Sequence, residues 1–255
     1  MSDVLMEVWQ DTVRTAPPPL AASIKVVHSP RLRSTGRPSR VRVSVRDLDT
    51  FELAAQYARP LVMNLADDNF PGGWVADGAC TQEESLFRRS NYFRTLTPEF
   101  YPVRDGEAVY SPQVTVIKDT AERHHLRLAE PFLVDLIACP GVKYPALVPP
   151  VPGVPGVPGV GAQLNETDVR RLTQKIELIF QVAEAFGHKT VIMGALGCGA
   201  WRCPPFHVAT IVRSVIESFD WNIDDVVFGI LRPRAHVVNP NLTNDNHAVF
   251  SRVFC

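Results

Sequence analysis

Two adjacent glutamates, Glu83 and Glu84, are the residues of this sequence best placed for acid–base chemistry. An apolar segment ending at residue 63 precedes them, followed by a polar loop that contains the pair Gly72-Gly73. Because glycine lacks a Cβ, the amide groups of such a loop can approach a ligand closely and form an anion-binding nest. Thr81 can N-cap a helix that begins at Gln82. The sequence therefore predicts a strand, a ligand-binding loop and a helix with two carboxyl groups in its first turn.

A second glycine-rich loop occupies residues 194–205 and has the sequence GALGCGAWRCPP. It also lies between an apolar strand and a helix. In open α/β sheets, ligands bind beyond the carboxyl ends of the strands, and phosphates bind backbone amides and helix N-termini. The G-x-x-G-x-G spacing is not the dinucleotide-binding fingerprint, and no Gly-Lys-Ser/Thr follows it as in a Walker A loop. Two such loops predict a diphosphate held from two sides.

Each of these features also has a purely structural explanation. Acidic residues in a first helical turn commonly stabilise the helix macrodipole, and glycine pairs commonly mark turns. In the helix after the first loop, we expect Leu86 and Phe87 to face the core. Arg88 and Arg89 would then lie on its outer side.

Helical and strand patterns alternate along the chain. Apolar spacing predicts helices at 3–15, from a cap at 47 or 49 to 57, and at 166–186, 206–219 and 243–253. It predicts strands at 23–28, 40–45, 61–63, 109–110, 114–118, 132–139, 190–193 and 225–231. The segment 132–139 is almost wholly apolar, as a central parallel strand would be. This order predicts an α/β fold, a three-layer α/β/α sandwich with a mixed, mostly parallel central sheet.

Length and composition restrict the class of protein. The chain has 255 residues and a net charge of -1, which argues against a sequence-specific nucleic-acid partner. Its five cysteines have no zinc-site or disulfide spacing, so we expect no metal and no cofactor. No apolar run reaches membrane-spanning length. We predict a soluble intracellular protein, cytoplasmic or nuclear, with one domain over 1–255, an N-terminal helical extension over 1–40 and a flexible Pro/Gly insertion at about 145–161.

The motifs together resemble a known family. The segment PGG, then GACTQEE, then GALGCGAWRCPP follow one another at the spacing of the microbial-type poly(ADP-ribose) glycohydrolases of the macrodomain superfamily. The resemblance runs from about Val41 to the C-terminus and includes VYSPQVTVIKD and VDLIACPGVKYPAL. It implies a macrodomain-like fold that hydrolyses O-glycosidic ADP-ribose linkages. ADP-ribose or ADP-ribosylated macromolecules, carrying poly- or mono-ADP-ribose, would be the substrates.

The resemblance also implies roles for individual residues. Glu84 matches the catalytic acid, Glu83 the neighbouring carboxylate that positions ribose hydroxyls, and Gln82 completes the motif. Asn64, Asp67 and Asn69 are the candidates for the asparagine that contacts the ribose in many macrodomains, and we favour Asn64. The remaining implied ligand-binding residues are Gly72, Gly73 and Trp74 in the first loop, Gly197, Cys198, Gly199 and Ala200 around the diphosphate, and Trp201 against the terminal ribose.

One position departs from the pattern. Relatives have three consecutive glycines, whereas Gly72-Gly73 is followed here by Trp74, so either the third glycine is lost or the loop is shifted by one residue. A bound diphosphate and Glu83 would favour the protonated form of Glu84, which could then donate a proton to the leaving oxygen and act as base on a water. The alternative is a reader that binds ADP-ribose without turnover. The QEE motif favours the enzyme, and the altered glycine run favours the reader.

Overall fold

A single seven-stranded sheet forms the centre of the protein. The computed structural model describes residues 2–31, 40–149, 162–233 and 245–255. Strand order is β1-β4-β5-β3-β8-β9-β2. All neighbours from β5 to β2 are parallel, whereas β4 pairs antiparallel with both β1 and β5. The strands are β1 (Ile24–Val27), β2 (Arg42–Arg46), β3 (Leu61–Asn64), β4 (Glu107–Lys118), β5 (Arg127–Ala138), β8 (Thr190–Met193) and β9 (Asp225–Gly229).

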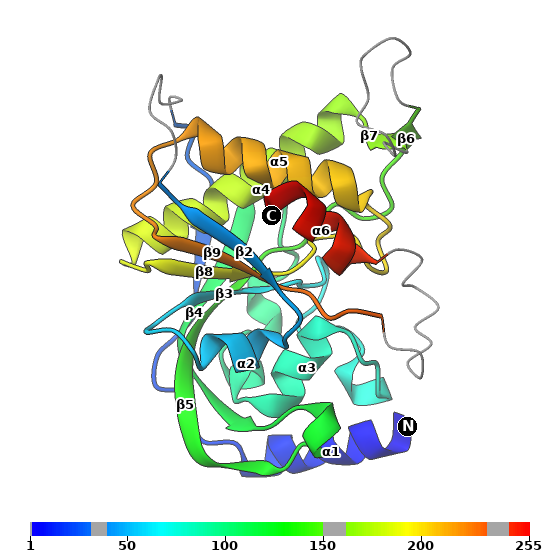
Figure 1. Ribbon diagram of the computed structural model, residues 1–255. Helices are drawn as coiled ribbons and strands as arrows, with labels where there is room; N and C mark the ends of the chain where they lie inside the picture. Colours follow the sequence, from blue (N-terminus) through cyan, green and yellow to red (C-terminus); the bar gives the residue numbers. More distant parts are fainter. Residues whose placement is uncertain (1, 32–39, 150–161, 234–244) are drawn as a thin grey trace.

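Helices cover both faces of this sheet. Figure 1 shows α4, α5 and α6 on one face and α1, α2 and α3 on the other. The helices are α1 (Ser2–Thr15), α2 (Thr50–Ala54), α3 (Gln82–Arg89), α4 (Glu166–Ala185), α5 (Pro205–Ser218) and α6 (Asn246–Phe254). Short 3-10 turns are η1 (Val75–Asp77), η2 (Tyr92–Arg94), η3 (Pro98–Phe100) and η4 (Ala121–Arg123). The predicted three-layer α/β/α fold with a mixed, mostly parallel sheet is confirmed.

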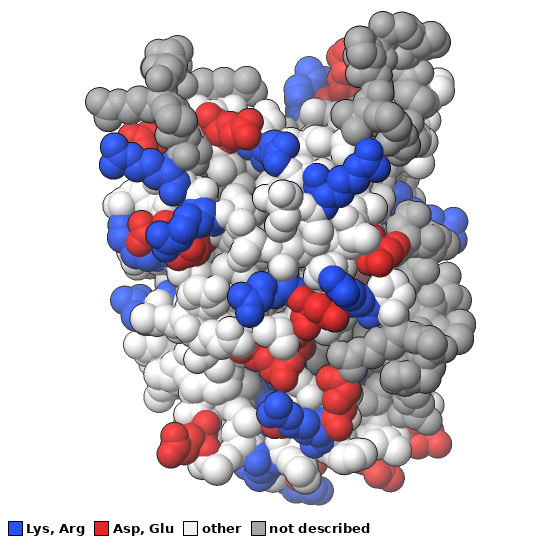
Figure 2. All heavy atoms as spheres, viewed as in Figure 1, with Lys and Arg blue, Asp and Glu red and all other residues white. Residues whose placement is uncertain are grey.

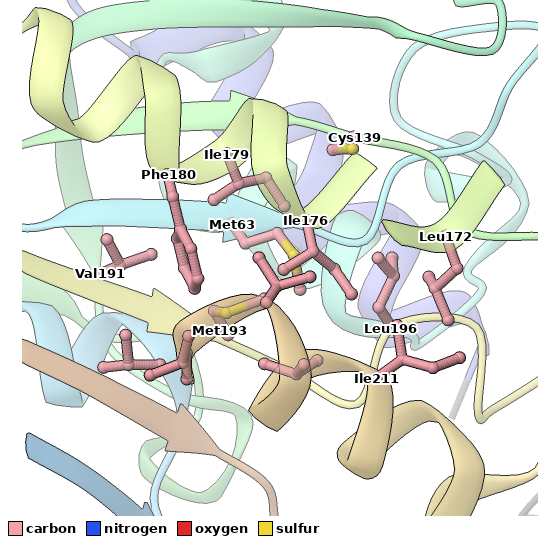
Figure 3. Close-up of a cluster of buried hydrophobic side chains, with 14 of the residues drawn as sticks. Met63, Cys139, Leu172, Ile176, Ile179, Phe180, Val191, Met193, Leu196 and Ile211 are labelled. Carbon is pink, nitrogen blue, oxygen red and sulfur yellow. The ribbon is translucent and has the colours of Figure 1, made fainter. Parts of the chain in front are cut away.

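The larger apolar core lies between the sheet and helices α4 and α5. Leu172, Ile176, Ile179 and Phe180 lie at helical spacing along α4 and are buried. Figure 3 shows these side chains pointing towards Met63 and Met193 of β3 and β8 and towards Ile211 of α5. Burying each large aliphatic or aromatic side chain contributes about 1.5–3 kcal/mol to folding. This packing fixes the carboxyl ends of β3 and β8, where the two glycine loops begin.

Strand β4 is longer than the sequence pattern indicates. Its pairing with β5 shifts register between Ser111 and Val114, where Gln113 has φ 55°. The amide of Gln113 donates instead to Asp135 Oδ1, at 2.7 Å. Pro112 cannot donate to the ladder and is compatible with such a bulge. The predicted strands 109–110 and 114–118 are therefore two halves of one strand.

Helix α1 packs closely against α3, and this contact corrects one expectation. The Thr12 hydroxyl donates to the carbonyl of Arg88 at 2.5 Å and accepts from the buried ammonium of Lys118 at 2.8 Å. Arg88 and Arg89 are not on an outer face, since both are about 2% exposed or less. Arg88 donates to the carbonyls of residues 75 and 79, and Arg89 pairs with Asp49 at 2.6 Å. The two guanidinium groups thus bind the surrounding loops.

Parts of the predicted layout lie outside the described residues. Strand β6 (Leu147–Val148) pairs antiparallel with β7 (Gln163–Leu164), which joins the two ends of the segment expected to be a flexible insertion. The VPG repeat within it, residues 151–160, is not among the described residues, and neither is the predicted helix start at 243.

The surface carries charges of both signs. Figure 2 shows Lys and Arg side chains interspersed with Asp and Glu on one face of the molecule. Within the described ranges, no helix is long and apolar enough to cross a membrane.

Candidate active site

Three loops meet at the carboxyl edge of the sheet. They follow β3, β5 and β8, which are adjacent and parallel. The loop after β5 contacts both of the others. The Cys139 amide donates to the Asn64 carbonyl at 3.2 Å, and a Cβ on Gly141 would lie 3.1 Å from the backbone of Gly197. Such an edge is where open α/β sheets bind ligands.

The carboxyl group of Glu83 is enclosed by the first loop. Glu83 is 3% exposed, and its oxygens accept hydrogen bonds from the Asp67 amide (2.8 Å), the Gly72 amide (3.1 Å) and Nδ2 of Asn64 (3.1 Å). Burial raises the pKa of Glu83 to about 8, although these three donors oppose the rise, and the nearby charge of Glu84 adds to it. Glu83 therefore holds two turns of the loop and the end of β3 together.

Glu84 contacts the next residues of the same loop. Its Oε1 accepts from the Trp74 amide at 3.1 Å, and its Oε2 accepts from the Thr81 amide at 3.0 Å and from the Thr81 hydroxyl. The bonds to Thr81 form a capping box, so the predicted N-cap is confirmed. Glu84 is 4% exposed. Both oxygens of each glutamate thus bind backbone amides, and these amides orient the carboxyl groups side by side.

The glycine pair is shaped by the side chains of α3. Gly72 and Gly73 have φ of +79° and +52°, a region that side chains rarely adopt. A Cβ on Gly72 would lie 2.6 Å from the ring of Phe87, and one on Gly73 would lie 2.4 Å from Glu84 Oε1. Glycine is therefore required at both positions for the loop to lie against the carboxyl groups.

Gln82 fastens the acidic helix to the end of β3. Its amide oxygen accepts from the Leu65 amide at 2.9 Å, and its amide nitrogen donates to the Met63 carbonyl at 2.7 Å. The side chain thus bonds the backbone on both sides of Asn64, at the end of β3. Its role in this structure is to position Glu83 and Glu84.

Two tyrosines lie beside Glu83. The Tyr92 hydroxyl lies 3.5 Å from Nδ2 of Asn64. Burial raises the pKa of Tyr101, and the charges of Glu83 and Asp67 raise it further, which places this phenol close to both. Among the described residues, neither the Tyr101 hydroxyl nor Oδ1 of Asn64 has a hydrogen-bond partner. Two buried polar atoms next to the carboxyl group are therefore available to bind water or a sugar hydroxyl.

The second loop contains a buried part and an open part. Cys198 is buried, which raises the pKa of its thiol, and a Cβ on Gly197 would lie 2.7 Å from Sγ of Cys203. In contrast, a Cβ on Gly199 would have no atom within 4 Å, and Ala200 is exposed. The loop therefore packs through residues 197 and 198 and presents the backbone of residues 199 and 200 to solvent.

Lys143 connects the two glycine loops. Its ammonium lies 3.4 Å from Asp67 and 2.9 Å from Asp68 in the first loop, and 5.4 Å from the centre of the Trp201 ring in the second. The carbonyl of Trp201 also accepts from the Tyr144 amide at 3.2 Å. One lysine thus fixes the indole predicted to contact the terminal ribose and the loop that holds Glu83.

Trp74 takes the position of the third glycine, but its indole does not fill the site. The side chain is 62% exposed, and its ring packs edge-on against Phe70 with 5.4 Å between centroids. The backbone amide is the part that contacts Glu84. The loop itself is therefore formed by backbone, with the indole outside it.

A cavity of about 860 Å³ lies beside the first loop and is lined in part by Lys143. It is lined by Asp68 and Asn69, by residues 102–105 and 140–146, and by the first turns of α4. Neither glutamate lines it. Within the described part of the chain, no group of His, Cys, Asp and Glu side chains is arranged to hold a metal ion.

Several residues of the site have no distinct sequence signal. Lys143, Tyr92 and Tyr101 are single residues outside the glycine loops, and only the tertiary fold brings them near Glu83 or Trp201. Thr81 was identifiable through the T-x-x-E spacing of its capping box, although only as a helix cap. All residues predicted for the site lie at this carboxyl edge. Among the described residues, the side chain of Gln82 forms hydrogen bonds only with backbone groups and with Thr50.

Comparisons with known proteins find a matching family model and solved structures with a similar fold. The family model described as microbial-type PARG, catalytic domain, matches residues 14–119. A search of curated proteins finds no match. Among solved structures, the poly(ADP-ribose) glycohydrolase from Thermomonospora curvata is 21% identical with a TM-score of 0.72, covering 99% of this chain and 98% of that one.

Two further structures were solved with ligands. The Thermomonospora curvata enzyme bound to the inhibitor ADP-HPD is 20% identical with a TM-score of 0.70, over 98% of each chain. The enzyme from Deinococcus radiodurans in complex with ADP-ribose is 20% identical with a TM-score of 0.63, over 99% of this chain and 90% of that one. The resemblance of this chain to the microbial-type poly(ADP-ribose) glycohydrolases is thus confirmed, by the family match over residues 14–119 and by a shared fold over nearly its whole length.

Proposed function

We propose that this protein is an ADP-ribosyl glycohydrolase, which hydrolyses O-glycosidic linkages of poly- or mono-ADP-ribose. The observation that carries the proposal is the glycine loop, whose amides at residues 67, 72 and 74 orient two buried carboxyl groups at the ligand-binding edge of the sheet. The similar proteins of known structure support it, since they are poly(ADP-ribose) glycohydrolases with ADP-ribose or ADP-HPD bound.

Binding would use both loops. The exposed backbone of Gly199 and Ala200 would take the diphosphate, because amide groups without a side chain in front of them can approach phosphate oxygens closely. Trp201, fixed by Lys143, would lie against the terminal ribose. Asn64 and Tyr101 would take part through their free polar atoms, directly or through a water. No cofactor enters this reaction.

Cleavage would use Glu84 as general acid and then as general base. As the bond between the anomeric carbon and the leaving oxygen breaks, the carboxyl proton of Glu84 would pass to that oxygen. The ribose would then carry positive charge, which the adjacent diphosphate stabilises. A water would add to the anomeric carbon and return its proton to Glu84. Proton transfer of this kind contributes about 10²–10⁴-fold to a rate.

Glu83 would be the positioning carboxyl group. It binds two amides of the loop and Asn64, so its removal would change the shape of the loop as well as its charge. Among the described residues, the carboxyl group of Glu84 accepts hydrogen bonds from residues 74 and 81, which lie at the two ends of the remaining loop. This division assigns the proton transfer to Glu84.

We also propose a domain organisation, a compartment and a class of partners for this protein. The chain would form one domain, because α1 and β1 of the N-terminal segment pack on α3 and pair with β4. It would act in the cytoplasm or nucleus on ADP-ribosylated macromolecules, without sequence-specific binding of nucleic acid and without a membrane partner. The net charge of -1 supports the absence of sequence-specific nucleic-acid binding.

The test has a binding arm and a turnover arm. ADP-ribose is titrated into purified protein by calorimetry, and release of ADP-ribose is then followed from poly(ADP-ribose) and from a protein with single ADP-ribose units. Glu84→Gln keeps the size of the side chain but cannot supply the proton. We expect it to bind ADP-ribose and to lose turnover by at least about 10²-fold. The matched control is Glu217→Gln on α5, whose side chain is 65% exposed on the opposite layer.

The outcomes separate the two candidate functions. Release by the wild type that Glu84→Gln abolishes supports the glycohydrolase. Binding without release would make the protein a reader, a possibility that the replacement of the third glycine by Trp74 favours. If the wild type did not bind ADP-ribose, both functions would be wrong. A folded Glu84→Gln variant with full turnover would contradict the role of Glu84 alone.

A further inference from the structure

Trp74 is an exposed aromatic side chain on a rigid backbone. All four tryptophans of the chain lie in the described residues, and only Trp74 is exposed. Its amide donates to Glu84 at 3.1 Å, and its carbonyl accepts from the amides of Asp77 and Ala79, both at 3.1 Å. Tryptophan is enriched where proteins bind partners, so an exposed indole on a hydrogen-bonded backbone is a suitable surface for recognition.

The indole is also oriented. The ring of Phe70 meets it edge-on, with 80° between the ring planes, and the Trp74 side chain nevertheless remains 62% exposed. This contact restricts the rotation of the indole and leaves ring surface free. A preorganised aromatic face of this kind binds another flat ring at a low entropic cost.

The position of this face relative to the proposed chemistry limits what it can contact. The residue that carries the indole is the residue whose amide holds the Glu84 carboxyl group. The Trp74 side chain is exposed whereas Glu84 is buried, so the indole lies on the solvent side of the acid, towards which a leaving group protonated by Glu84 would depart. In poly(ADP-ribose) the leaving oxygen belongs to the ribose of an adenosine, so an adenine lies one sugar ring from the bond that breaks. In a mono-ADP-ribosylated protein the leaving group is an amino-acid side chain.

We propose that Trp74 is a specificity residue that stacks on the adenine of the leaving adenosine and thereby selects poly(ADP-ribose) over mono-ADP-ribosylated protein. This inference rests on the proposed glycohydrolase function and names its preferred substrate. Stacking of a base on an aromatic side chain changes affinity by about 5- to 150-fold. The same factor applies to kcat/KM for the polymer, and it is absent for a leaving group without a base.

The experiment compares Trp74→Ala and Trp74→Phe with the wild type on two substrates. These are poly(ADP-ribose) and a peptide carrying one O-linked ADP-ribose on serine. We expect Trp74→Ala to lower kcat/KM for the polymer by about 5- to 150-fold more than it lowers kcat/KM for the peptide, because only the polymer offers a base for stacking. Trp74→Phe, which keeps a ring, should recover part of the loss. The control is Leu20→Ala, which also removes an exposed apolar side chain (61% exposed) but lies outside both glycine loops.

A binding arm keeps this proposal distinct from the proposed function. In the Glu84→Gln background, the ratio of the affinities for short poly(ADP-ribose) and for ADP-ribose is measured with and without Trp74→Ala. We expect the alanine to lower this ratio by the same factor, whether or not the wild type hydrolyses anything. An unchanged ratio, or an equal loss on polymer and peptide, would overturn the proposal. If the wild type showed no turnover but Trp74→Ala still lowered this affinity ratio, only the glycohydrolase function would be wrong.

Discussion

Replacing Gly73 with alanine tests whether the glycine loop shapes the acid site. The added Cβ would lie 2.4 Å from Oε1 of Glu84, an atom that also accepts the Trp74 amide. The methyl group and the carboxyl group cannot both keep their positions. In addition, φ of Gly73 is +52°, and the left-handed region costs a residue with a side chain roughly 1–2 kcal/mol. The substitution therefore has a cost in stability and a separate effect on the geometry of the acid.

Gly187 provides a matched control for the first of these costs. It follows the C-terminus of α4 with φ +75°, and a Cβ there would have nothing within 4 Å. Gly187→Ala thus introduces the backbone strain without a collision. Strain of roughly 1–2 kcal/mol lowers the Tm of a chain of this size by about 2–8 °C. We expect both variants to show this decrease, measured by thermal denaturation.

Turnover should distinguish the two variants. We expect Gly73→Ala to lower kcat for ADP-ribose release by about 10²-fold or more, since a displaced Glu84 no longer reaches the leaving oxygen. Gly187→Ala should keep the wild-type kcat at a temperature where both variants are folded. Equal kcat values for the two variants would refute the reasoning, because the loop would then tolerate a side chain that the contact with Glu84 forbids.

Three other changes have definite expected outcomes. Because the pKa of Glu83 rises from 4.5 to about 8 on folding, the folded state binds the extra proton between these values, so the free energy of unfolding should fall as pH rises from about 5 to 8. Denaturant titrations should show this slope, and Glu83→Gln should lack it. Gln82→Glu places a carboxylate oxygen against the Met63 carbonyl, now 2.7 Å from the Gln82 amide nitrogen, and should cost about 1–3 kcal/mol of stability by the same assay. Lys143→Met removes the contact between the first loop and Trp201, so it should weaken ADP-ribose binding by about 3- to 10-fold, and by more at low salt. Calorimetry measures this change in Kd, and an unchanged Kd would contradict the role of Lys143 in connecting the two loops.

The sequence was sufficient where periodicity and capping act locally. The helix α4 follows from its apolar stripe, and α3 begins at Gln82 because Thr81 and Glu84 form a capping box. The apolar segment at 132–139 indeed belongs to a central strand, although β5 starts earlier, at Arg127, where the pattern is no longer apolar. Order and class of the elements were predictable because each depends on neighbours within a few residues.

The environment of the acid pair was not predictable in the same way. Arg88 and Arg89 follow the glutamates on a short helix, and charged residues at such positions are normally exposed. They are buried because α1, more than seventy residues earlier, covers α3, and because carbonyl groups and Asp49 accept their hydrogen bonds. A contact between distant segments leaves no periodic signal, and the same holds for Lys143 at the junction of the two loops.

The structure shows which positions of the glycine run need glycine in this chain. Gly72 and Gly73 have positive φ values, whereas Trp74 has φ -98°, which any residue adopts. Its amide still binds Glu84, as an amide at that position would with any side chain. The first two glycines are thus required by Phe87 and Glu84, whereas the third position is free to vary. A change there leaves the acid site intact and alters only what lies outside it, which is why the indole can set substrate preference without a cost to the proposed chemistry.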